Sequence, residues 1–235
     1  MLKTKNPHVR DEAIFFDEEP HKYYINGKCD NISATTLIHS YGEKFDADRI
    51  IGFMMKGKNW TESKYYGMTK EEIKQQWKDN GSEAARLGTH MHKSIEDYWN
   101  ELEVDNESKE YELFKRFRED HQDLKAYRTE WEVYHEDYEV CGSIDMIFEN
   151  DDGTLSIYDW KRCKEIEKTS KYNKKCKKPV SHLQDTNYWH YALQLNLYKF
   201  ILESKYEKTI KDLHILCLHP INDEYLKFEL PNLQK

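Results

Sequence analysis

Two adjoining apolar segments separated by a tight turn constrain the fold of this chain more than any other feature. Residues 140–149 and 154–161 are rich in β-branched and aromatic side chains, and the run Asn150-Asp151-Asp152-Gly153 between them is typical of a turn. The sequence therefore predicts two consecutive strands, and a further strand over residues 127–134 precedes them.

Charged side chains occupy defined positions in this pair of strands. Alternate residues of a strand share a face, so Asp159 and Lys161 point the same way and Trp160 points into the opposite layer. Asp145 lies in the middle of the other apolar strand, where a buried carboxylate must be paired or coordinated. Each residue alone is also explained by a solvated strand face or a weak surface ion pair. Together they match a metal-dependent phosphodiesterase, in which carboxylates hold a hard cation and a lysine orients water or stabilises charge on the phosphate.

A helix far upstream carries further candidates. Its apolar side chains recur at helical spacing, at Leu87, Met91, Ile95, Tyr98 and Leu102, and Ser82 is expected to cap it. His92 and Glu96 are four residues apart and line the adjacent stripe. Glu130, at the start of the strand over residues 127–134, either faces the same site or lies at an exposed strand end.

The remaining elements complete an α/β pattern. Helices are expected over 107–122 and 188–205, and strands over 213–218 and 225–230. From residue 82 the order is helix, helix, three strands, helix, strand, which predicts a central mixed sheet flanked by helices. In the helix over 188–205, Gln194 and Tyr198 are four residues apart and share a face, as do the polar flanks of many amphipathic helices.

Residues 1–81 are expected to form a separate N-terminal part, with residues 82–235 as one compact core. The apolar runs at 14–16 and 23–25, with the turn signal Asn26-Gly27, predict a small β-hairpin element. Short helices are expected over 33–40, 46–56 and 69–80. Thr69 and Glu72 fit a capping box at the start of the last of these.

Composition limits the classes of function. Lys and Arg number 36 and Asp and Glu 44, giving a net charge of -8, so a nucleic-acid surface would have to be a local basic patch. The sequence contains no run of about 18 apolar residues, so no membrane span is predicted. The N-terminus lacks an apolar signal region, and the five cysteines are widely spaced, which favours reduced thiols and an intracellular location.

Four motifs, in this order and spacing, resemble the RecB-like PD-(D/E)XK nuclease superfamily. They are Gly88-Thr-His-Met-His92-x-x-x-Glu96, Gly142-Ser-Ile-Asp145, Asp159-Trp-Lys161 and Gln194-x-x-x-Tyr198. The group includes the RecB nuclease domain, CRISPR-associated RecB-like exonucleases and the mitochondrial genome maintenance exonuclease. The resemblance covers about residues 82–218, and residues 32–46 look more loosely like phage and viral members. Each motif is weak alone, whereas four on the expected elements are a strong signal.

The resemblance implies a restriction-endonuclease-like core and assigns roles within it. His92, Asp145, Asp159 and the Trp160 backbone carbonyl would bind Mg²⁺ or Mn²⁺, and Lys161 would be the catalytic lysine. Gln194, Tyr198 and Glu96 would contact the nucleic-acid backbone or brace the site. Some relatives carry an iron–sulfur cluster that uses three cysteines near the C-terminus. This chain lacks those cysteines, so no iron–sulfur cluster is expected.

The segment from Cys163 to Asn187 is expected to be an irregular, basic insert. Residues 161–178 contain nine Lys or Arg against two Glu. Such a run is often only a solvated loop, but its place after the catalytic strand favours a nucleic-acid clamp. The lysines expected to hold phosphates are Lys171, Lys174, Lys175, Lys177 and Lys178. A structural zinc site is the alternative use of this region, with Cys163, Cys176, His182 and His190 as ligands at irregular spacing.

Together these features predict a Mg²⁺- or Mn²⁺-dependent DNA exonuclease in DNA repair, recombination or replication. Single-stranded DNA ends or flaps are the expected substrate, because the N-terminal helices would form a wall or arch that admits one strand more readily than a duplex. An endonuclease of the same fold acting on duplex DNA or RNA is one alternative. A nucleic-acid-binding module without catalysis is the other.

Overall fold

The computed structural model describes residues 1–234, which form two compact units. One unit, called here the sheet unit, consists of residues 1–43 and the chain from Met91 onward. The other, the helical unit, is Lys44–His90. Helix α4 runs without interruption from Lys70 to Trp99 and belongs to both units. The separate helix predicted to begin at Ser82 is therefore wrong, and the boundary expected after residue 81 falls inside α4.

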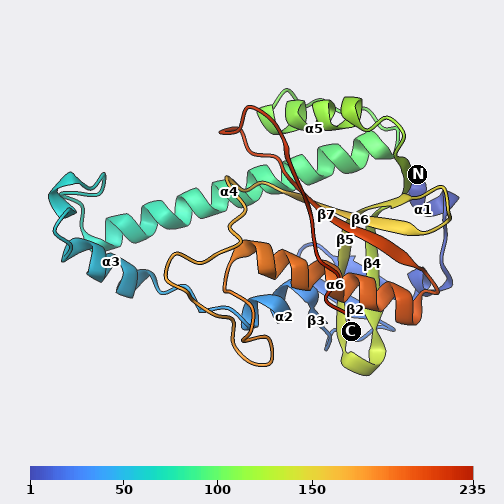
Figure 1. Ribbon diagram of the computed structural model, residues 1–235, viewed down its shortest axis with the longest axis horizontal. Coiled ribbons are helices and arrows are strands. Elements are labelled where there is room, and N and C mark those ends of the chain that lie inside the picture. Colours follow the sequence, from blue (N-terminus) through green and yellow to red (C-terminus); the bar gives the residue numbers. More distant parts are fainter. Residues whose placement is uncertain (235) are drawn as a thin grey trace. The chain divides into compact units, whose positions relative to one another are not determined.

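The sheet unit is an α/β structure with a mixed sheet flanked by helices (Figure 1). Its strands are β1 (Ile14–Asp17), β2 (Lys22–Ile25), β3 (Ile32–Ser33), β4 (Lys125–His135), β5 (Val140–Glu149), β6 (Leu155–Lys161), β7 (Ile210–Cys217) and β8 (Leu226–Glu229). Its helices are α1 (Leu2–Lys5), α2 (Ala34–Ser40), α5 (Lys109–Asp120), α6 (Asn187–Lys205) and the end of α4. Short 3₁₀ turns span Val9–Glu12 and Glu136–Tyr138.

The predicted elements from residue 107 onward are confirmed to within a few residues. Strand β8 is the expected edge strand, and the insert between β6 and α6 contains no helix or strand. Strand β3 was not predicted, because two residues are too few to show a periodicity. The hairpin forms as β1–β2, but residues 18–21 join its strands, so Asn26-Gly27 is not the turn between them. Asn26 and Gly27, with φ of 50° and 77°, instead make a second tight turn after β2 that joins Ile25 to Lys28.

Two apolar cores lie on opposite faces of the sheet, under helices that Figure 1 shows on either side of it. Helix α6 packs on one face, against side chains such as Ile157 and Ile215. Helix α5 and the end of α4 pack on the other, against Phe148 and Trp160. Trp160 is 1% exposed, so it enters the layer opposite Asp159 and Lys161, as predicted.

The pairing around β5 opens a gap at one edge of that strand. One edge of β5 pairs with β4 from Val140 to Glu149, except at Asp145. The other edge pairs with β6 at residues 146–149 and with β3 at Val140 and Cys141. Residues 142–145 therefore have no strand neighbour on this edge, which leaves room for a site between β3 and β6.

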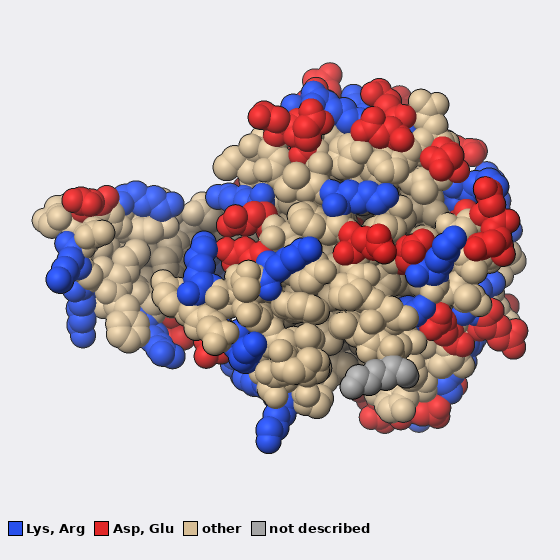
Figure 2. Space-filling model, viewed as in Figure 1, with Lys and Arg blue, Asp and Glu red and all other residues tan. Residues whose placement is uncertain are grey.

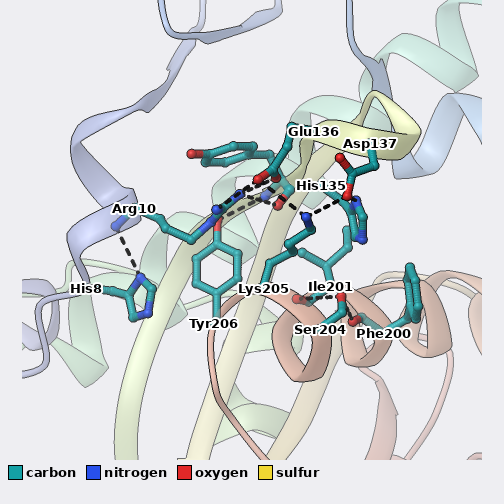
Figure 3. Close-up of polar contacts among 11 residues, drawn as sticks. His8, Arg10, His135, Glu136, Asp137, Phe200, Ile201, Ser204, Lys205 and Tyr206 are labelled. Carbon is teal, nitrogen blue, oxygen red and sulfur yellow. Dashed lines mark hydrogen bonds and ion pairs between the residues drawn. The ribbon is translucent and has the colours of Figure 1, made fainter.

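A polar cluster joins the N-terminal segment of the sheet unit to the ends of β4 and α6 (Figure 3). Arg10 donates to Glu136 at 2.6 Å and stacks 4.0 Å above the Tyr134 ring. The Tyr134 backbone N–H donates to the Tyr206 hydroxyl at 3.0 Å, and Lys205 pairs with Asp137 at 2.7 Å. These contacts join the segment before β1, the end of β4 and the end of α6.

The helical unit contains α3 (Ala47–Met55), a 3₁₀ turn (Trp60–Glu62) and the first part of α4. Asp46 caps α3, and Thr69 and Glu72 form the predicted capping box at the start of α4. Lys70 and Lys74 both pair with Asp48 at 3.0 Å, linking the two helices. Across residues 1–234, no helix combines the length and apolar character needed to cross a membrane.

Candidate active site

A cavity of about 520 Å³ lies at the gap between β3 and β6. Five of the residues predicted from the sequence line it: Asp145, Asp159, Lys161, Gln194 and Tyr198. The remaining wall comes from the β1–β2 hairpin, from the start of α2 and from β5, at positions that include Lys22, Tyr23, Ser33, Thr35, Thr36 and Ser143. The fold therefore brings three distant parts of the chain around one acidic centre.

Asp145 stands where β5 and β6 separate. The backbone pairing of these strands ends at Met146 and Tyr158. Two residues after Tyr158, the Trp160 N–H donates to the side chain of Asp145, at 2.9 Å from its Oδ2, instead of to a strand carbonyl. Because the N–H and C=O of one strand residue point to the same edge, the Trp160 carbonyl is directed to the Asp145 side of β6.

Asp159 and Lys161 form a buried ion pair beside it. Lys161 Nζ lies 2.6 Å from Asp159 Oδ2, and the side chains are 20% and 4% exposed. The Lys161 ammonium also lies 5.0 Å from the centre of the Tyr191 ring on α6, in cation–π contact. Lys161 is thus held between a carboxylate and an aromatic ring, with its ammonium at the cavity.

His92 and Glu130 approach Asp145 from the other side. His92 Nδ1 lies 3.5 Å from Asp145 Oδ2 and 4.0 Å from Glu130 Oε1. Ser143 donates to Glu130 Oε2 at 2.8 Å. The backbone of Glu130 has a φ of 42°, a strained value for a strand residue. In a regular strand, Ile144 and Met146 would point to the same face. Here Ile144 enters one core and Met146 the other, so the alternation of β5 is interrupted at Asp145.

Negative charge is concentrated in this site. Burial raises the pKa of Asp159 to about 6, and Asp145 adds to the increase while Lys161 opposes it. Burial also raises the pKa of Glu130 to about 8, again with a contribution from Asp145. Burial by itself lowers the pKa of Lys161, but the attraction of Asp159 and Asp145 outweighs it and raises that pKa above its ordinary value. The two acidic neighbours therefore favour the ammonium form of Lys161.

The donor set fits a divalent cation. Ligand atoms of His92, Glu130 and Asp145 lie within 4.8 Å of one another. Asp159 raises the carboxylate count, and its buried Oδ2 makes no well-aligned hydrogen bond despite the nearby lysine. Carboxylate and carbonyl oxygens suit Mg²⁺ and Mn²⁺, and a cation here would favour the ionised carboxylates against the burial and mutual repulsion that raise their pKa values. Glu130, which the sequence left undecided, belongs to this group.

Tyr198 and Gln194 brace the cavity from α6. The Gln194 side-chain amide donates to Thr35 Oγ1 at 3.0 Å and to the Tyr198 hydroxyl at 3.4 Å. Tyr198 is 3% exposed, and burial raises the pKa of its hydroxyl well above the ordinary range. A Cβ at Gly142 would lie 2.7 Å from that hydroxyl oxygen, so the glycine of the Gly142–Asp145 motif makes room for the tyrosine.

The other predicted residues lie outside the cavity wall. Glu96 accepts from Lys93 at 3.0 Å, and its charge adds to the raised pKa of Glu130. Several lysines of the insert are bound to the protein itself. Lys171 pairs with Glu167, Lys174 with Glu43, and Lys177 donates to the Ser40 carbonyl.

Lys175 and Lys178 differ from their neighbours in the insert. Neither has an ion-pair partner within residues 1–234. Tyr172 nearby is 84% exposed. Figure 2 shows Lys and Arg interspersed with Asp and Glu over the visible face. A phosphate-holding role therefore rests on fewer lysines of the insert than the sequence indicated.

The four-residue zinc set considered as an alternative from the sequence is not assembled. Cys163 lies beside Cys217 instead, with 3.5 Å between the two sulfur atoms, and His182 is exposed. All five cysteines are free thiols. Cys176 and His190 do lie together, with Asp185 as a third neighbour.

Sequence reasoning missed the residues that long-range packing brings to the cavity. Lys22 and Tyr23 arrive on the hairpin, and nothing local connects them with Asp145. Tyr191 was detectable, because positions 191, 194 and 198 repeat at spacings of three and four and so share one face of α6. A scan of the chain against protein-family models gives no match, and neither does a search of the curated proteins.

Proposed function

We propose that this protein is a metal-dependent DNA nuclease with a restriction-endonuclease-like core. The observation that carries the proposal is the convergence of Asp145, Asp159 and Lys161 where two strands separate, with His92 and Glu130 beside them. The order of α4, α5, β4, β5, β6, α6 and β7 agrees with the RecB-like resemblance of the four motifs.

The chain's own residues have distinct roles in this proposal. His92, Glu130, Asp145, Asp159 and the Trp160 carbonyl hold the cation. A bound Mg²⁺ or Mn²⁺ supplies Lewis-acid activation of the phosphate and of the attacking water. The Lys161 ammonium donates hydrogen bonds to a phosphate oxygen or to that water, which stabilises the charge that develops as a new oxygen–phosphorus bond forms. The attacking water gives up a proton to solvent, and the leaving oxygen of the broken phosphodiester bond takes up a proton.

Single-stranded DNA ends or flaps are the proposed substrate. Lys175 and Lys178 supply basic contacts for a phosphate backbone, and exposed Tyr172 offers a ring on which a base can stack. The proposed biological context is DNA repair, recombination or replication.

Two substrates test the proposal, an end-labelled linear single strand and a circular single strand. Each is incubated with Mg²⁺, Mn²⁺ or EDTA. A ladder of short products from linear DNA in either metal, with circles spared and no cleavage in EDTA, is the expected result. Cleaved circles would make the protein an endonuclease. Binding without products in either metal would leave a nucleic-acid-binding module, and parallel RNA and duplex substrates establish the preferred nucleic acid.

A further inference from the structure

A second group of metal-binding side chains lies outside the candidate active site. Cys176, Asp185 and His190 present a thiol, a carboxylate and an imidazole whose ligand atoms are within 4.8 Å of one another. Cys176 is 3% exposed, and the side chains of Asp185 and His190 are 11% and 20% exposed. None of the three lines the cavity that contains Asp145. They come from the insert and the first turns of α6, and are called here the Cys176 cluster.

Backbone hydrogen bonds hold the cluster in place. The Cys176 N–H donates to the Leu183 carbonyl at 3.1 Å, and the Asp185 N–H donates to the Lys174 carbonyl at 3.0 Å. Asp185 Oδ2 also accepts from the Glu43 N–H at 2.9 Å. The ligands are thus carried by an ordered turn of the insert that is already attached to the segment after α2.

The separations within the cluster are close to those around a tetrahedral ion. Zinc bonds of about 2.0–2.3 Å place tetrahedral ligand atoms roughly 3.3–3.7 Å apart. His190 Nε2 lies 2.8 Å from Asp185 Oδ1, yet this buried nitrogen makes no well-aligned hydrogen bond. The cluster is also close to the backbone, since a Cβ at Gly42 would lie 3.0 Å from Asp185 Oδ1 and from His190 Cε1. Small rotations of side chains would bring the three atoms to zinc-binding separations.

The chemistry of the three donors selects the ion. A sulfur and an imidazole nitrogen favour Zn²⁺ over the hard cations Mg²⁺ and Ca²⁺, which take oxygen ligands. A thiolate and a carboxylate together neutralise the two charges of the ion. We propose that the Cys176 cluster binds Zn²⁺, with a fourth position open to water, and that the ion clamps the basic insert onto α6.

Binding of the ion has consequences for protons and stability. The Cys176 thiol must lose its proton to become a ligand, so zinc affinity should fall as the pH is lowered. Because only the folded chain presents the three ligands together, Zn²⁺ should raise the melting temperature. This site is independent of the proposed nuclease function, because it shares no ligand with it.

Cobalt absorption tests the site on the full chain after removal of metals with EDTA. Co²⁺ bound to a thiolate gives a charge-transfer band in the near ultraviolet, whereas the ligands proposed for the candidate active site include no thiol. Cys29 lines that cavity, so Cys29→Ser also tests whether a band arises there. The band should appear in the parent and in Asp145→Asn, and added Zn²⁺ should abolish it. It should be lost in Cys176→Ser and reduced several-fold in His190→Gln. The matched controls Cys29→Ser and His182→Gln, both at exposed residues, should keep it.

Two results would overturn the inference. One is a parent protein without a thiolate band at Co²⁺ concentrations well above that of the protein. The other is a band that survives Cys176→Ser and disappears in Cys163→Ser, which would assign the ion to the Cys163–Cys217 pair. Circular dichroism of each variant establishes that it is folded. If Cys176→Ser is unfolded, His190→Gln against His182→Gln decides the question.

Discussion

Substitution of Gly142 by alanine tests the packing that positions the candidate site. The new Cβ would lie 2.7 Å from the Tyr198 hydroxyl oxygen and 2.8 Å from its Cε1. Carbon atoms attract each other at about 3.5–4.0 Å, so the ring must move by at least roughly 0.7 Å. Tyr198 is 3% exposed and has little free space to enter. Such overpacking typically costs about 1–3 kcal/mol of unfolding free energy.

Urea unfolding and thermal melting measure this cost. For a chain of this size, each kcal/mol lowers the melting temperature by about 2–4 °C. Tyr198→Phe removes the closest atom but leaves Cε1, so it should relieve the clash only in part. In a Tyr198→Leu background, which lacks both atoms, Gly142→Ala should cost almost nothing more. The double-mutant cycle therefore attributes the penalty to this one contact.

Gly81→Ala is a matched control that should change the unfolding free energy in the opposite direction. Gly81 lies within α4, and a Cβ there would meet no other atom within 4 Å among residues 1–234. Gly81→Ala should therefore stabilise the protein by about 0.5–1 kcal/mol through helix propensity. If Gly142→Ala is as stable as the parent, or if its cost is unchanged by Tyr198→Leu, the packing argument is wrong.

Three further predictions concern pH, metal and DNA. Burial lowers the pKa of His214 from 6.5 to about 4, so its unfolded form binds more protons in that window. Stability should fall as the pH drops from about 6.5 to 4, by up to about 3 kcal/mol, and urea titrations should show a smaller loss in His214→Gln. By calorimetry, His92→Ala should weaken Mn²⁺ binding whereas Lys161→Ala should retain it; the reverse result would mean that the roles are misassigned. Replacing Lys175 and Lys178 by serine should weaken single-strand binding and flatten its salt dependence by about 0.7 in slope per lost contact, and unchanged binding would exclude them as phosphate contacts.

The sheet and its acidic residues were predictable because they depend on local periodicity. Alternation along β6 placed Asp159 and Lys161 on one face and Trp160 on the other, and all three lie as predicted. The helix start predicted at Ser82 is wrong, because a serine that could cap a new helix can also lie inside a continuous one. Gly81, which precedes Ser82, costs a helix only about 1 kcal/mol. That cost is smaller than the contribution of the backbone hydrogen bonds that a continuous helix retains. The capping box at Thr69 marks the actual start.

The parts of the site that depend on tertiary structure could not be predicted in this way. Glu130 joins His92 and Asp145 because β4 pairs with β5 and because its own backbone adopts a left-handed φ. Lys22 reaches the cavity only through the placement of the hairpin. The pairing of the insert lysines was not predictable either, because Lys174 pairs with Glu43, which is far away in the sequence.

Cleavage of labelled single-stranded DNA in Mn²⁺ by Asp145→Asn tests the central claim most directly. Asp152→Asn is the matched control, because Asp152 is an exposed aspartate in the β5–β6 turn. The account predicts that the parent and Asp152→Asn cleave at the same rate in Mn²⁺. Asp145→Asn should remain folded by circular dichroism and yield no products above the EDTA background. Equal cleavage by the parent and by folded Asp145→Asn, or no cleavage by the parent in Mn²⁺ or Mg²⁺, would contradict the account.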